Sequence, residues 1–274
     1  MSDSIKPLCI YMGSKMAIAD WIVPMFPKHK TYVEVFGGTA AILLNKPKSP
    51  VEIYNDKNIF MSNLFECIIR YYDEFKDRVS KWNVSEVRYS DYFDNHIVKP
   101  STFPDLEAAL RYYYVLKVVG YGKYTGGFYV NIDSSNQVFD GALRDIENFH
   151  KRFKTVLVFS RDFERLIRNT NKPDTLFYLD PPYKGTESYY EKITGAFEET
   201  DHIKLRDILY NIKGMFYLSY EDDAFVRDLY SDPKFSILEK EKFRPGQGEY
   251  KTEIVITNHF PEHNFLFSQD QMNG

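Results

Sequence analysis

The sequence predicts an α/β protein with a mostly parallel sheet and an inserted, mostly helical subdomain. Short apolar segments rich in β-branched and aromatic residues alternate with segments of helical periodicity, which is typical of a parallel sheet covered by helices. The segments that resemble strands are unevenly spread, because two come before residue 60 and the next clear one begins near residue 155. With 274 residues, the chain has room for both the sheet and the insert.

The strands and helices follow from periodicity and from the turn residues that bound each segment. Strands are predicted at residues 32–36, 51–54, 155–159, 176–179, 216–219 and 253–257. Helices are predicted at residues 40–44, 58–75, 111–119, 202–210 and 223–230. Asp56 or Asn58 is expected to cap the second of these helices. We therefore expect a main domain formed by residues 1–60 and 151–274, with a connecting helix and an insert at residues 61–150.

Composition and charge restrict the class of protein. The net charge of −4 argues against a simple nucleic-acid-binding module, which would be basic, but it leaves room for an enzyme with a local basic cleft. Cys9 and Cys67 are expected to pack as small apolar side chains, and His259 and His263 are expected to be surface residues with no metal bound. The sequence shows neither a signal-peptide pattern nor an apolar run of the length of a membrane span, so we expect a soluble, cytoplasmic protein.

Two features at strand ends indicate a nucleotide-like cofactor. The first predicted strand ends at Phe36 and runs into Gly37 and Gly38, where ligands of open α/β sheets bind and where glycine lets the backbone approach closely. Asp56 ends the second strand about 20 residues later, the place from which an acid binds ribose hydroxyls. An ordinary strand-to-helix turn and a simple helix cap are the alternatives. The phosphate-binding glycine patterns are absent, which favours an adenosine cofactor without a pyrophosphate.

The segment TLFYLDPPY carries the most informative motif. Pro181 and Pro182 cannot donate ladder hydrogen bonds, so the buried strand must stop at Asp180. The motif therefore presents the Asp180 carboxylate and the Tyr183 ring on a rigid corner. A turn in which Asp180 is only a local cap is the alternative.

These motifs, in this order, resemble those of the Dam-type, class alpha family of S-adenosylmethionine-dependent adenine-N6 DNA methyltransferases. Segment 11–15, YMGSK, resembles the N-terminal cofactor motif of that family, and segment 160–163, SRDF, resembles its Asp-Phe pair. Segment 252–258 resembles the closing strand, so the resemblance extends from residue 11 to residue 258 and is weakest between about 75 and 150. The family often has a second glycine where this chain has Ala40, and alanine fits there if its φ stays negative.

The resemblance implies a Rossmann-like methyltransferase sheet in which the insert recognises the target. It implies that S-adenosyl-L-methionine binds, with Asp56 on the ribose and Asp162 on the adenine amine of the cofactor. Asp180 and the carbonyl of Pro181 would accept hydrogen bonds from the target amine, and Tyr183 would stack on a flipped adenine. The expected cofactor-binding residues are Tyr11, Lys15, Phe36, Gly37, Gly38, Asp56, Asp162 and Asp180; the expected catalytic residues are Asp180, Pro181, Pro182 and Tyr183.

Basic residues among aromatic ones suggest where DNA binds. Between residues 111 and 130 there is no acid, and either a glycine-rich loop at 120–127 reaches DNA or the tyrosines of a helix ending near residue 119 simply pack inward. A second candidate is an exposed loop at 242–248. The expected DNA-binding residues are Arg111, Lys117, Lys123, Tyr124, Lys242 and Arg244.

The expected partner is double-stranded DNA, with no membrane and no obligate protein partner, and restriction–modification is an expected setting. A cytosine-N4 methyltransferase, an RNA adenine methyltransferase and a non-catalytic DNA-binding protein that retains the fold are the alternatives.

Overall fold

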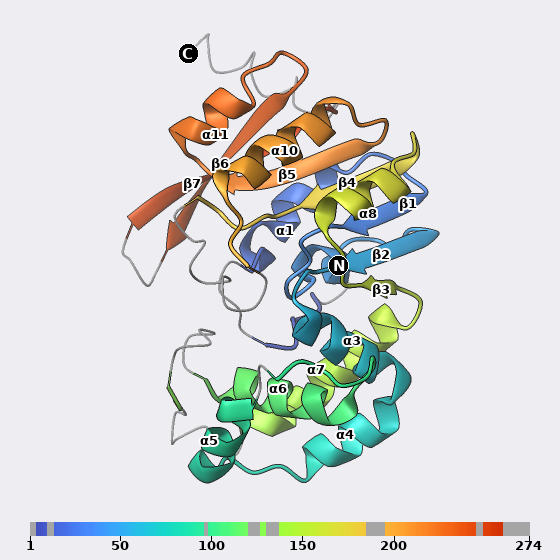
Figure 1. Cartoon of the computed structure of the whole chain (residues 1–274), viewed down its shortest axis with the longest axis vertical. Helices are drawn as coiled ribbons and strands as arrows, with labels where there is room; N and C mark the ends of the chain where they lie inside the picture. Colours follow the sequence, from blue (N-terminus) through green and yellow to red (C-terminus); the bar gives the residue numbers. More distant parts are fainter. Residues whose placement is uncertain are drawn as a thin grey trace, which may run out of the picture. The chain divides into compact units, whose positions relative to one another are not determined.

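A computed structural model describes residues 4–9, 14–95, 98–119, 127–129, 137–184, 195–244 and 249–259, without the side chains of 137, 242–244, 249 and 250. The described strands form one seven-stranded sheet in the order β3-β2-β1-β4-β5-β7-β6 (Figure 1). Their bounds are β1 Thr31–Glu34, β2 Val51–Asn55, β3 Leu157–Phe159, β4 Thr175–Leu179, β5 Met215–Glu221, β6 Ser236–Arg244 and β7 Glu249–Thr257. The predicted α/β class is confirmed.

The sheet is mostly parallel. β4 pairs in parallel with β1 on one side and with β5 on the other, and Glu34 lies opposite Tyr178 in the first of these pairs. β7 is antiparallel to both β5 and β6. The motifs that follow β1 and β4 therefore leave the carboxyl ends of two hydrogen-bonded parallel strands, which is where open α/β sheets bind their ligands.

The edge strand β6 was not predicted. Its sequence, SILEKEKFR, is rich in alternating charges, which are common on sheet edges because they discourage pairing with other chains. The first three residues of the predicted exposed loop at 242–248 are instead part of β6, where Lys242 and Arg244 lie opposite Lys251 and Glu249 of β7. Residues 245–248 lie outside the described residues.

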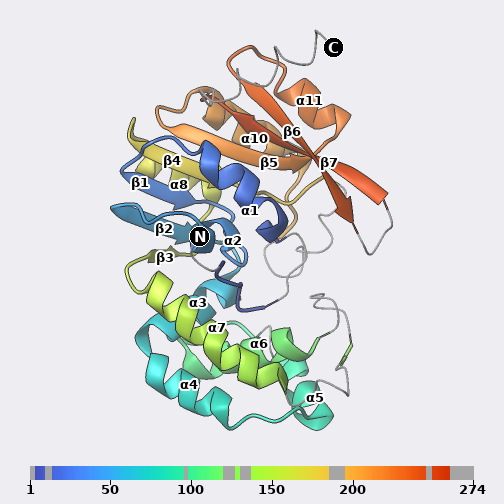
Figure 2. The same cartoon turned by 180° about the vertical axis from the view of Figure 1, so that it is seen from behind.

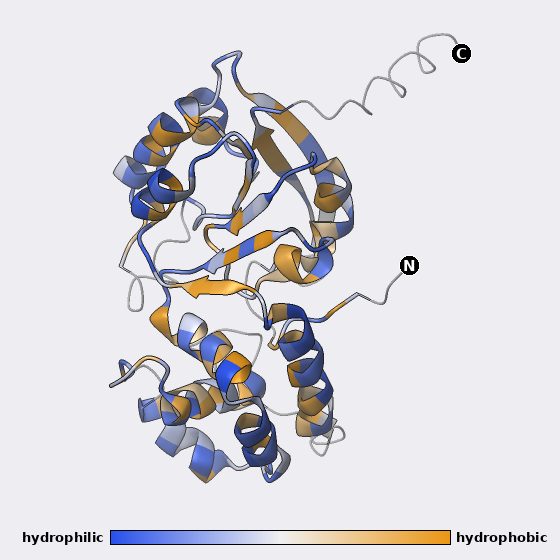
Figure 3. Ribbon diagram, turned by 90° about the vertical axis from the view of Figure 1, so that its right-hand side faces the viewer, coloured by the Kyte–Doolittle hydropathy of each residue, from blue (hydrophilic) through white to orange (hydrophobic). Residues whose placement is uncertain are grey.

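Between β2 and β3 the described residues are mostly helical, as predicted. Helices α3 to α7 gather there, as Figure 2 shows from behind. The helical ribbons in Figure 3 carry hydrophobic and hydrophilic colours by turns, as amphipathic helices do. The described helices are α1 Met16–Ile22, η1 Val23–Met25, α2 Ala41–Asn45, α3 Ile59–Arg70, α4 Tyr72–Ser80, α5 Glu86–Asn95, α6 Leu106–Val118, α7 Gln137–Phe153, α8 Phe163–Thr170, α10 Glu199–Tyr210 and α11 Ala224–Leu229. No helix in these ranges is long and apolar enough to cross a membrane.

The predicted helix 58–75 is two helices. Asn58 caps α3, because its Oδ1 accepts the N–H groups of Phe60 at 3.0 Å and Met61 at 3.4 Å. The helix breaks at Tyr71, whose backbone has φ −118° and ψ 37°. The side chain of Tyr71 is exposed, so no burial holds this residue in a continuous helix.

Helix α6 confirms that its tyrosines pack inward, whereas residues 120–126 of the predicted DNA-contacting loop lie outside the described residues. Tyr112, Tyr113 and Tyr114 are fully buried. The hydroxyl of Tyr112 accepts from Asn58 Nδ2 at 3.1 Å, and the ring of Tyr113 lies 5.7 Å from that of Phe75. These side chains form the core of the helical insert, so they are not available to stack on a base.

The chain divides into two compact units. The first unit comprises Met1–Asp20, Phe36–Lys48 and Glu52–Asp162, and the second comprises Trp21–Val35, Ser49–Val51 and Phe163–Gly274. The glycine loop and Asp56 belong to the first unit, and the Asp-Pro-Pro-Tyr corner belongs to the second. The division into domains that we predicted, with boundaries near residues 60 and 150, stays a prediction.

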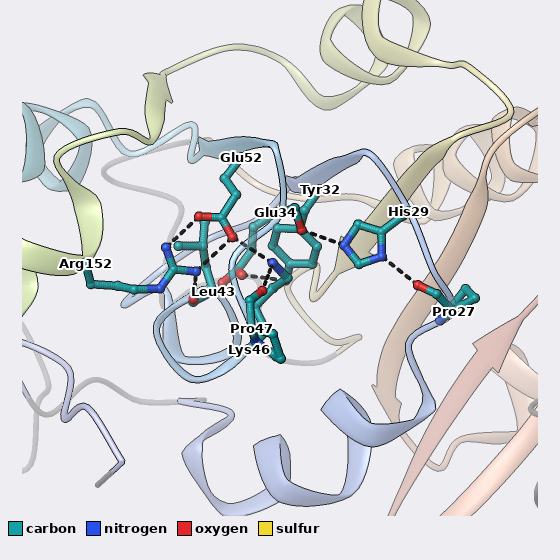
Figure 4. Close-up of polar contacts among 10 residues, drawn as sticks. Pro27, His29, Tyr32, Glu34, Leu43, Lys46, Pro47, Glu52 and Arg152 are labelled. Carbon is teal, nitrogen blue, oxygen red and sulfur yellow. Dashed lines mark hydrogen bonds and ion pairs between the residues drawn. The ribbon is translucent and has the colours of Figure 1, made fainter. Parts of the chain in front are cut away.

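A buried ionic cluster fixes α7 to β2 within the first unit (Figure 4). Arg152 donates from Nη1 to Glu52 Oε2 at 2.5 Å and from Nη2 to Glu52 Oε1 at 2.9 Å, and Lys46 donates to the same Oε1 at 2.7 Å. Burial raises the pKa of Glu52, but the hydrogen bonds from Arg152 and Lys46 outweigh it, and the net pKa is lowered. Arg152 Nη2 also donates to Leu43 O at 2.5 Å, so one side chain joins α7, α2 and β2.

Candidate active site

The glycine loop after β1 is packed tightly against the end of β2. The N–H of Gly37 donates to Asn55 O at 2.8 Å, and the Tyr54 hydroxyl donates to Gly38 O at 2.8 Å. A Cβ atom at Gly37 would lie 2.2 Å from Cε2 of the Tyr54 ring, so packing leaves no room for a side chain there. Gly38 has φ +49°, a left-handed conformation that favours glycine.

Asp56 holds this loop. Its Oδ2 accepts the N–H of Gly38 and its Oδ1 accepts the N–H of Asn58, each at 2.7 Å. Burial raises the pKa of Asp56, and the two backbone hydrogen bonds offset only part of that rise. Because Asn58 is the residue that caps α3, the simple helix-cap alternative for Asp56 is wrong. Its predicted role on the cofactor ribose stays a prediction.

The segment after β3 that contains Asp162 is hydrogen-bonded to the end of β2. Asn55 Oδ1 accepts the N–H of Arg161 at 2.8 Å, and Asn55 Nδ2 donates to Arg161 O at 3.1 Å. The N–H of Asp56 donates to Phe159 O at 3.2 Å. The first unit therefore brings together the backbone that precedes Asp162 and the acid that follows β2, as the cofactor prediction requires.

Of the N-terminal motif, Ser14 and Lys15 are described, and Tyr11 lies outside the described residues. The Ser14 hydroxyl is 3.5 Å from the Thr39 hydroxyl, one residue after Gly38. Lys15 is buried next to the start of α1. The part of the motif that the structure describes thus lies against the glycine loop.

Ala40 corrects one expectation. Its φ is +59° and its ψ is 33°, so the condition under which alanine was expected to fit, a negative φ, is not met. The N–H of Ala40 donates back to Gly37 O at 2.7 Å, and α2 begins at the next residue. A left-handed conformation costs an alanine about 1–2 kcal/mol, so this position stores strain that a glycine would not.

Within the second unit, the motif carboxylate is fixed by the neighbouring strand. β4 is fully buried and ends at Leu179, directly before Asp180. Ser219 on β5 donates from Oγ to Asp180 Oδ1 at 3.2 Å and to Leu179 O at 3.3 Å. Ser219 Oγ also lies 2.9 Å from the hydroxyl of Tyr178, so a buried network orients the acid. The sequence did not single out Ser219, since nothing along the chain shows that β5 lies beside β4.

The Tyr183 side chain is also held by residues outside its motif. Its hydroxyl donates to Glu253 Oε1 at 2.5 Å, and its ring centroid lies 5.6 Å from that of Tyr220. Burial, followed by the charges of Asp180 and Glu253, raises the pKa of Tyr183 well above its usual value. The phenol therefore stays protonated and acts as a donor. Glu253 was missed as a single residue, although an acid at the start of an apolar strand is a signal in itself.

The predicted DNA-binding residues are dispersed. Arg111 lies on α6 within electrostatic reach of Asp105 and Glu107, two acids that precede it on the chain. Lys117 is half-buried; burial lowers its pKa, and Asp145 of α7 partly compensates. Lys123 and Tyr124 lie outside the described residues, and so do the side chains of Lys242 and Arg244. The roles of all these residues in DNA binding stay predictions.

The residues on either side of the glycine-rich segment are paired, because Val119 and Phe128 form an antiparallel bridge.

In the part of the chain that the structure describes, no group of three or more His, Cys, Asp and Glu side chains could hold a metal ion.

A glycine loop after β1, a half-buried acid after β2 and an Asp-Pro-Pro-Tyr corner after β4 of a mostly parallel sheet define a Rossmann-like methyltransferase fold. The chain belongs to the D12 class N6 adenine-specific DNA methyltransferase family, whose model matches residues 11–245. The resemblance identified from the motifs is thereby confirmed.

Two modification methylases are similar to this chain at low identity. StsI of Streptococcus sanguinis is 24% identical over 225 residues, which cover 75% of this chain and 33% of the relative. LlaI of Lactococcus lactis subsp. lactis is 25% identical over 204 residues, which cover 70% of this chain and 32% of the relative. The chain therefore spans about a third of the length of these relatives.

Proposed function

We propose that this protein transfers a methyl group from S-adenosyl-L-methionine to N6 of a flipped-out adenine in double-stranded DNA. The observation that carries the proposal is the corner at the end of β4, where Ser219 orients the Asp180 carboxylate beside two prolines. Membership of the adenine-specific family supports adenine as the base. The names of the two relatives support a role in DNA modification.

The residues of the first unit fit the cofactor. A Cβ at Gly38 would meet nothing within 4 Å, so there is open space beside this loop into which an adenosine could approach. Asp56 presents a half-buried carboxylate there, which suits ribose hydroxyls, and Asp162 would accept from the adenine amine. Tyr11, Lys15, Phe36 and Gly37 complete the set proposed for this unit. When bound, the cofactor supplies an electrophilic methyl group on a sulfonium.

The corner residues would prepare the target amine. The lone pair of adenine N6 is delocalised into the ring, which makes the amine a poor nucleophile. Asp180 and the carbonyl of Pro181 would accept its two N–H bonds and favour a more tetrahedral nitrogen. Tyr183 would stack on the base, and Pro182 would keep the backbone rigid. Attack on the methyl group is direct, so no covalent enzyme intermediate is required.

Adenine N6 is not accessible within a duplex, so the base must leave the helix. Flipping costs a few kcal/mol, which stacking and hydrogen bonds in the site must offset. Cytosine N4 has the same pair of N–H bonds, and an adenine in RNA has the same amine. These acceptors are therefore the alternatives that an experiment has to separate.

Methyl-labelled cofactor tests the proposal. The full chain is incubated with unmethylated double-stranded DNA or with RNA, beside Asp180→Ala and a control variant at an exposed aspartate of α11, Asp228→Ala. We expect label on DNA with the wild type and the control, and a loss of at least about 100-fold with Asp180→Ala. Equal labelling by Asp180→Ala, or label on RNA alone, would contradict the proposal.

A further inference from the structure

Tyr183 is anchored at both ends of its side chain by residues outside the Asp-Pro-Pro-Tyr motif. Its hydroxyl donates to Glu253 Oε1 on β7 at 2.5 Å. Its ring is tilted by 39° against the ring of Tyr220 on β5, with the centroids 5.6 Å apart. The hydroxyl of Tyr220 in turn lies 2.6 Å from Nδ1 of the buried His202 on α10. The ring is thus held by three further elements of the second unit.

The contact between Glu253 and Tyr183 is a strong one for physical reasons. Glu253 is 1% exposed, and a buried carboxylate is stable only when it is hydrogen-bonded. A hydrogen bond to a charged acceptor is shorter and about twice as strong as one between neutral groups. The raised pKa of Tyr183 keeps its hydroxyl protonated, so the donor is present throughout the ordinary pH range.

The prolines cannot orient this ring by themselves. Pro181 and Pro182 fix the backbone, but the Tyr183 side chain still turns about its χ1 and χ2 bonds. A stacking residue is effective only when its plane is parallel to the base, so an anchor at the far end of the ring reduces the entropy lost on binding. Glu253 supplies that anchor from a strand that lies far along the chain.

We infer that Glu253 is a positioning residue, which sets the orientation of the Tyr183 ring against the target base. This inference rests on the proposed methyl transfer. Its consequence is that the effect of residue 253 on methylation passes through Tyr183, and that the shape and hydrogen-bonding capacity of residue 253 matter more than its charge. Loss of the anchor should weaken the productive binding of DNA and leave cofactor binding nearly unchanged.

Four variants test this inference by steady-state methylation of unmethylated double-stranded DNA. We expect Glu253→Ala and Tyr183→Phe each to lower kcat/KM for DNA by about tenfold or more, because each removes the hydrogen bond to a charged group. The kcat/KM of the double variant should be no more than about threefold below that of the less active single variant, because both changes remove the same contact. Glu253→Gln keeps an oxygen acceptor and should stay within about threefold of the wild type. The KM for the cofactor should change by less than about twofold in all four.

A matched control removes a carboxylate from the neighbouring strand. Glu239 of β6 is exposed and pairs with Arg227 at 2.6 Å, so Glu239→Ala should leave methylation unchanged. Multiplicative losses in the double variant, or a loss in Glu253→Gln as large as that in Glu253→Ala, would overturn the inference. A fall in thermal stability with no change in the KM for DNA would overturn it too.

The coupling free energy between the substitutions at residues 183 and 253, measured by urea unfolding, tests this inference independently of the proposed function. If the wild type transfers no methyl group, the proposed function fails, and the unfolding free energies of the same variants then decide whether the anchor exists. Coupling between residues 183 and 253 supports the anchor, and additive effects overturn it. If Glu253→Ala does not fold, Glu253→Met, which removes the acceptor and keeps a long side chain, completes the cycle with Tyr183→Phe.

Discussion

The glycine loop after β1 allows the sharpest test of the structure, by the substitution Gly37→Ala. A Cβ at this position would lie 2.2 Å from Cε2 and 2.6 Å from Cδ2 of the Tyr54 ring. Because carbon atoms pack best at about 3.5–4.0 Å, the ring or the loop would have to move by more than about 1 Å. Tyr54 is fully buried, and its ring lies 4.8 Å from that of Phe65 and 6.0 Å from that of Phe153. The ring has little space into which it could move.

The expected loss of unfolding free energy follows from these contacts. Overpacking of a buried site costs about 1–3 kcal/mol. Displacement of Tyr54 would also lengthen its hydrogen bond to Gly38 O, 2.8 Å in the structure, at a cost of about 0.5–1.5 kcal/mol. We expect Gly37→Ala to lower the free energy of unfolding by roughly 2–4 kcal/mol. We also expect weaker binding of S-adenosyl-L-methionine, because Gly38 and Asp56 would lose their present geometry.

Gly141→Ala is the matched control. Gly141 lies inside helix α7, and a Cβ there would meet nothing within 4 Å. Alanine in place of glycine inside a helix stabilises by about 0.5–1 kcal/mol, so the two substitutions should have opposite signs. Urea unfolding followed by circular dichroism measures the difference, and calorimetric titration measures cofactor binding. Equal stability of the two variants would refute the packing that we describe around the loop.

Three further predictions concern strain, orientation and charge. Ala40→Val should lower the free energy of unfolding in urea by more than about 2 kcal/mol, because a β-branched residue would occupy a buried site at φ +59°. Ala40→Gly should change the free energy of unfolding by less than about 1 kcal/mol. Ser219→Ala should lower kcat by about tenfold with little change in the KM for the cofactor, because it removes the hydroxyl that orients Asp180; an unchanged kcat would contradict this. Glu52→Gln should cost about 3–5 kcal/mol at neutral pH by leaving Arg152 and Lys46 without their anion. The pKa of Glu52 in the folded protein lies below its usual 4.5. The stability that ionised Glu52 contributes is therefore fully present above pH 4.5 and is lost as the pH falls through the folded pKa. The Glu52→Gln variant should lack this part of the acid-induced loss of stability.

The sequence predicted the features that are local to the chain. β4 was found because TLFYL is a continuous apolar run, and its end was found because prolines cannot continue a strand. The glycine loop and Asp56 were found because each follows a strand directly. The start of α3 was placed correctly because Asn58 has the side chain of an N-cap.

The rest depends on which strands become neighbours. Ser219 and Glu253 meet Asp180 and Tyr183 because β5 and β7 follow β4 in the sheet order, and no local pattern encodes that order. The left-handed conformation of Ala40 was missed because alanine gives no sign of a positive φ. β6 was missed because its charges obscure the alternation expected of a strand.

Analysis of the methylated nucleoside tests the central proposal most directly. Unmethylated double-stranded DNA is incubated with the protein and S-adenosyl-L-methionine, digested to nucleosides and analysed by mass spectrometry. We predict that N6-methyl-2′-deoxyadenosine appears with the wild type and is absent with Asp180→Ala. A wild-type digest that contains N4-methyl-2′-deoxycytidine in its place, or no methylated nucleoside, would contradict the proposal that the corner at Asp180 holds the amine of adenine.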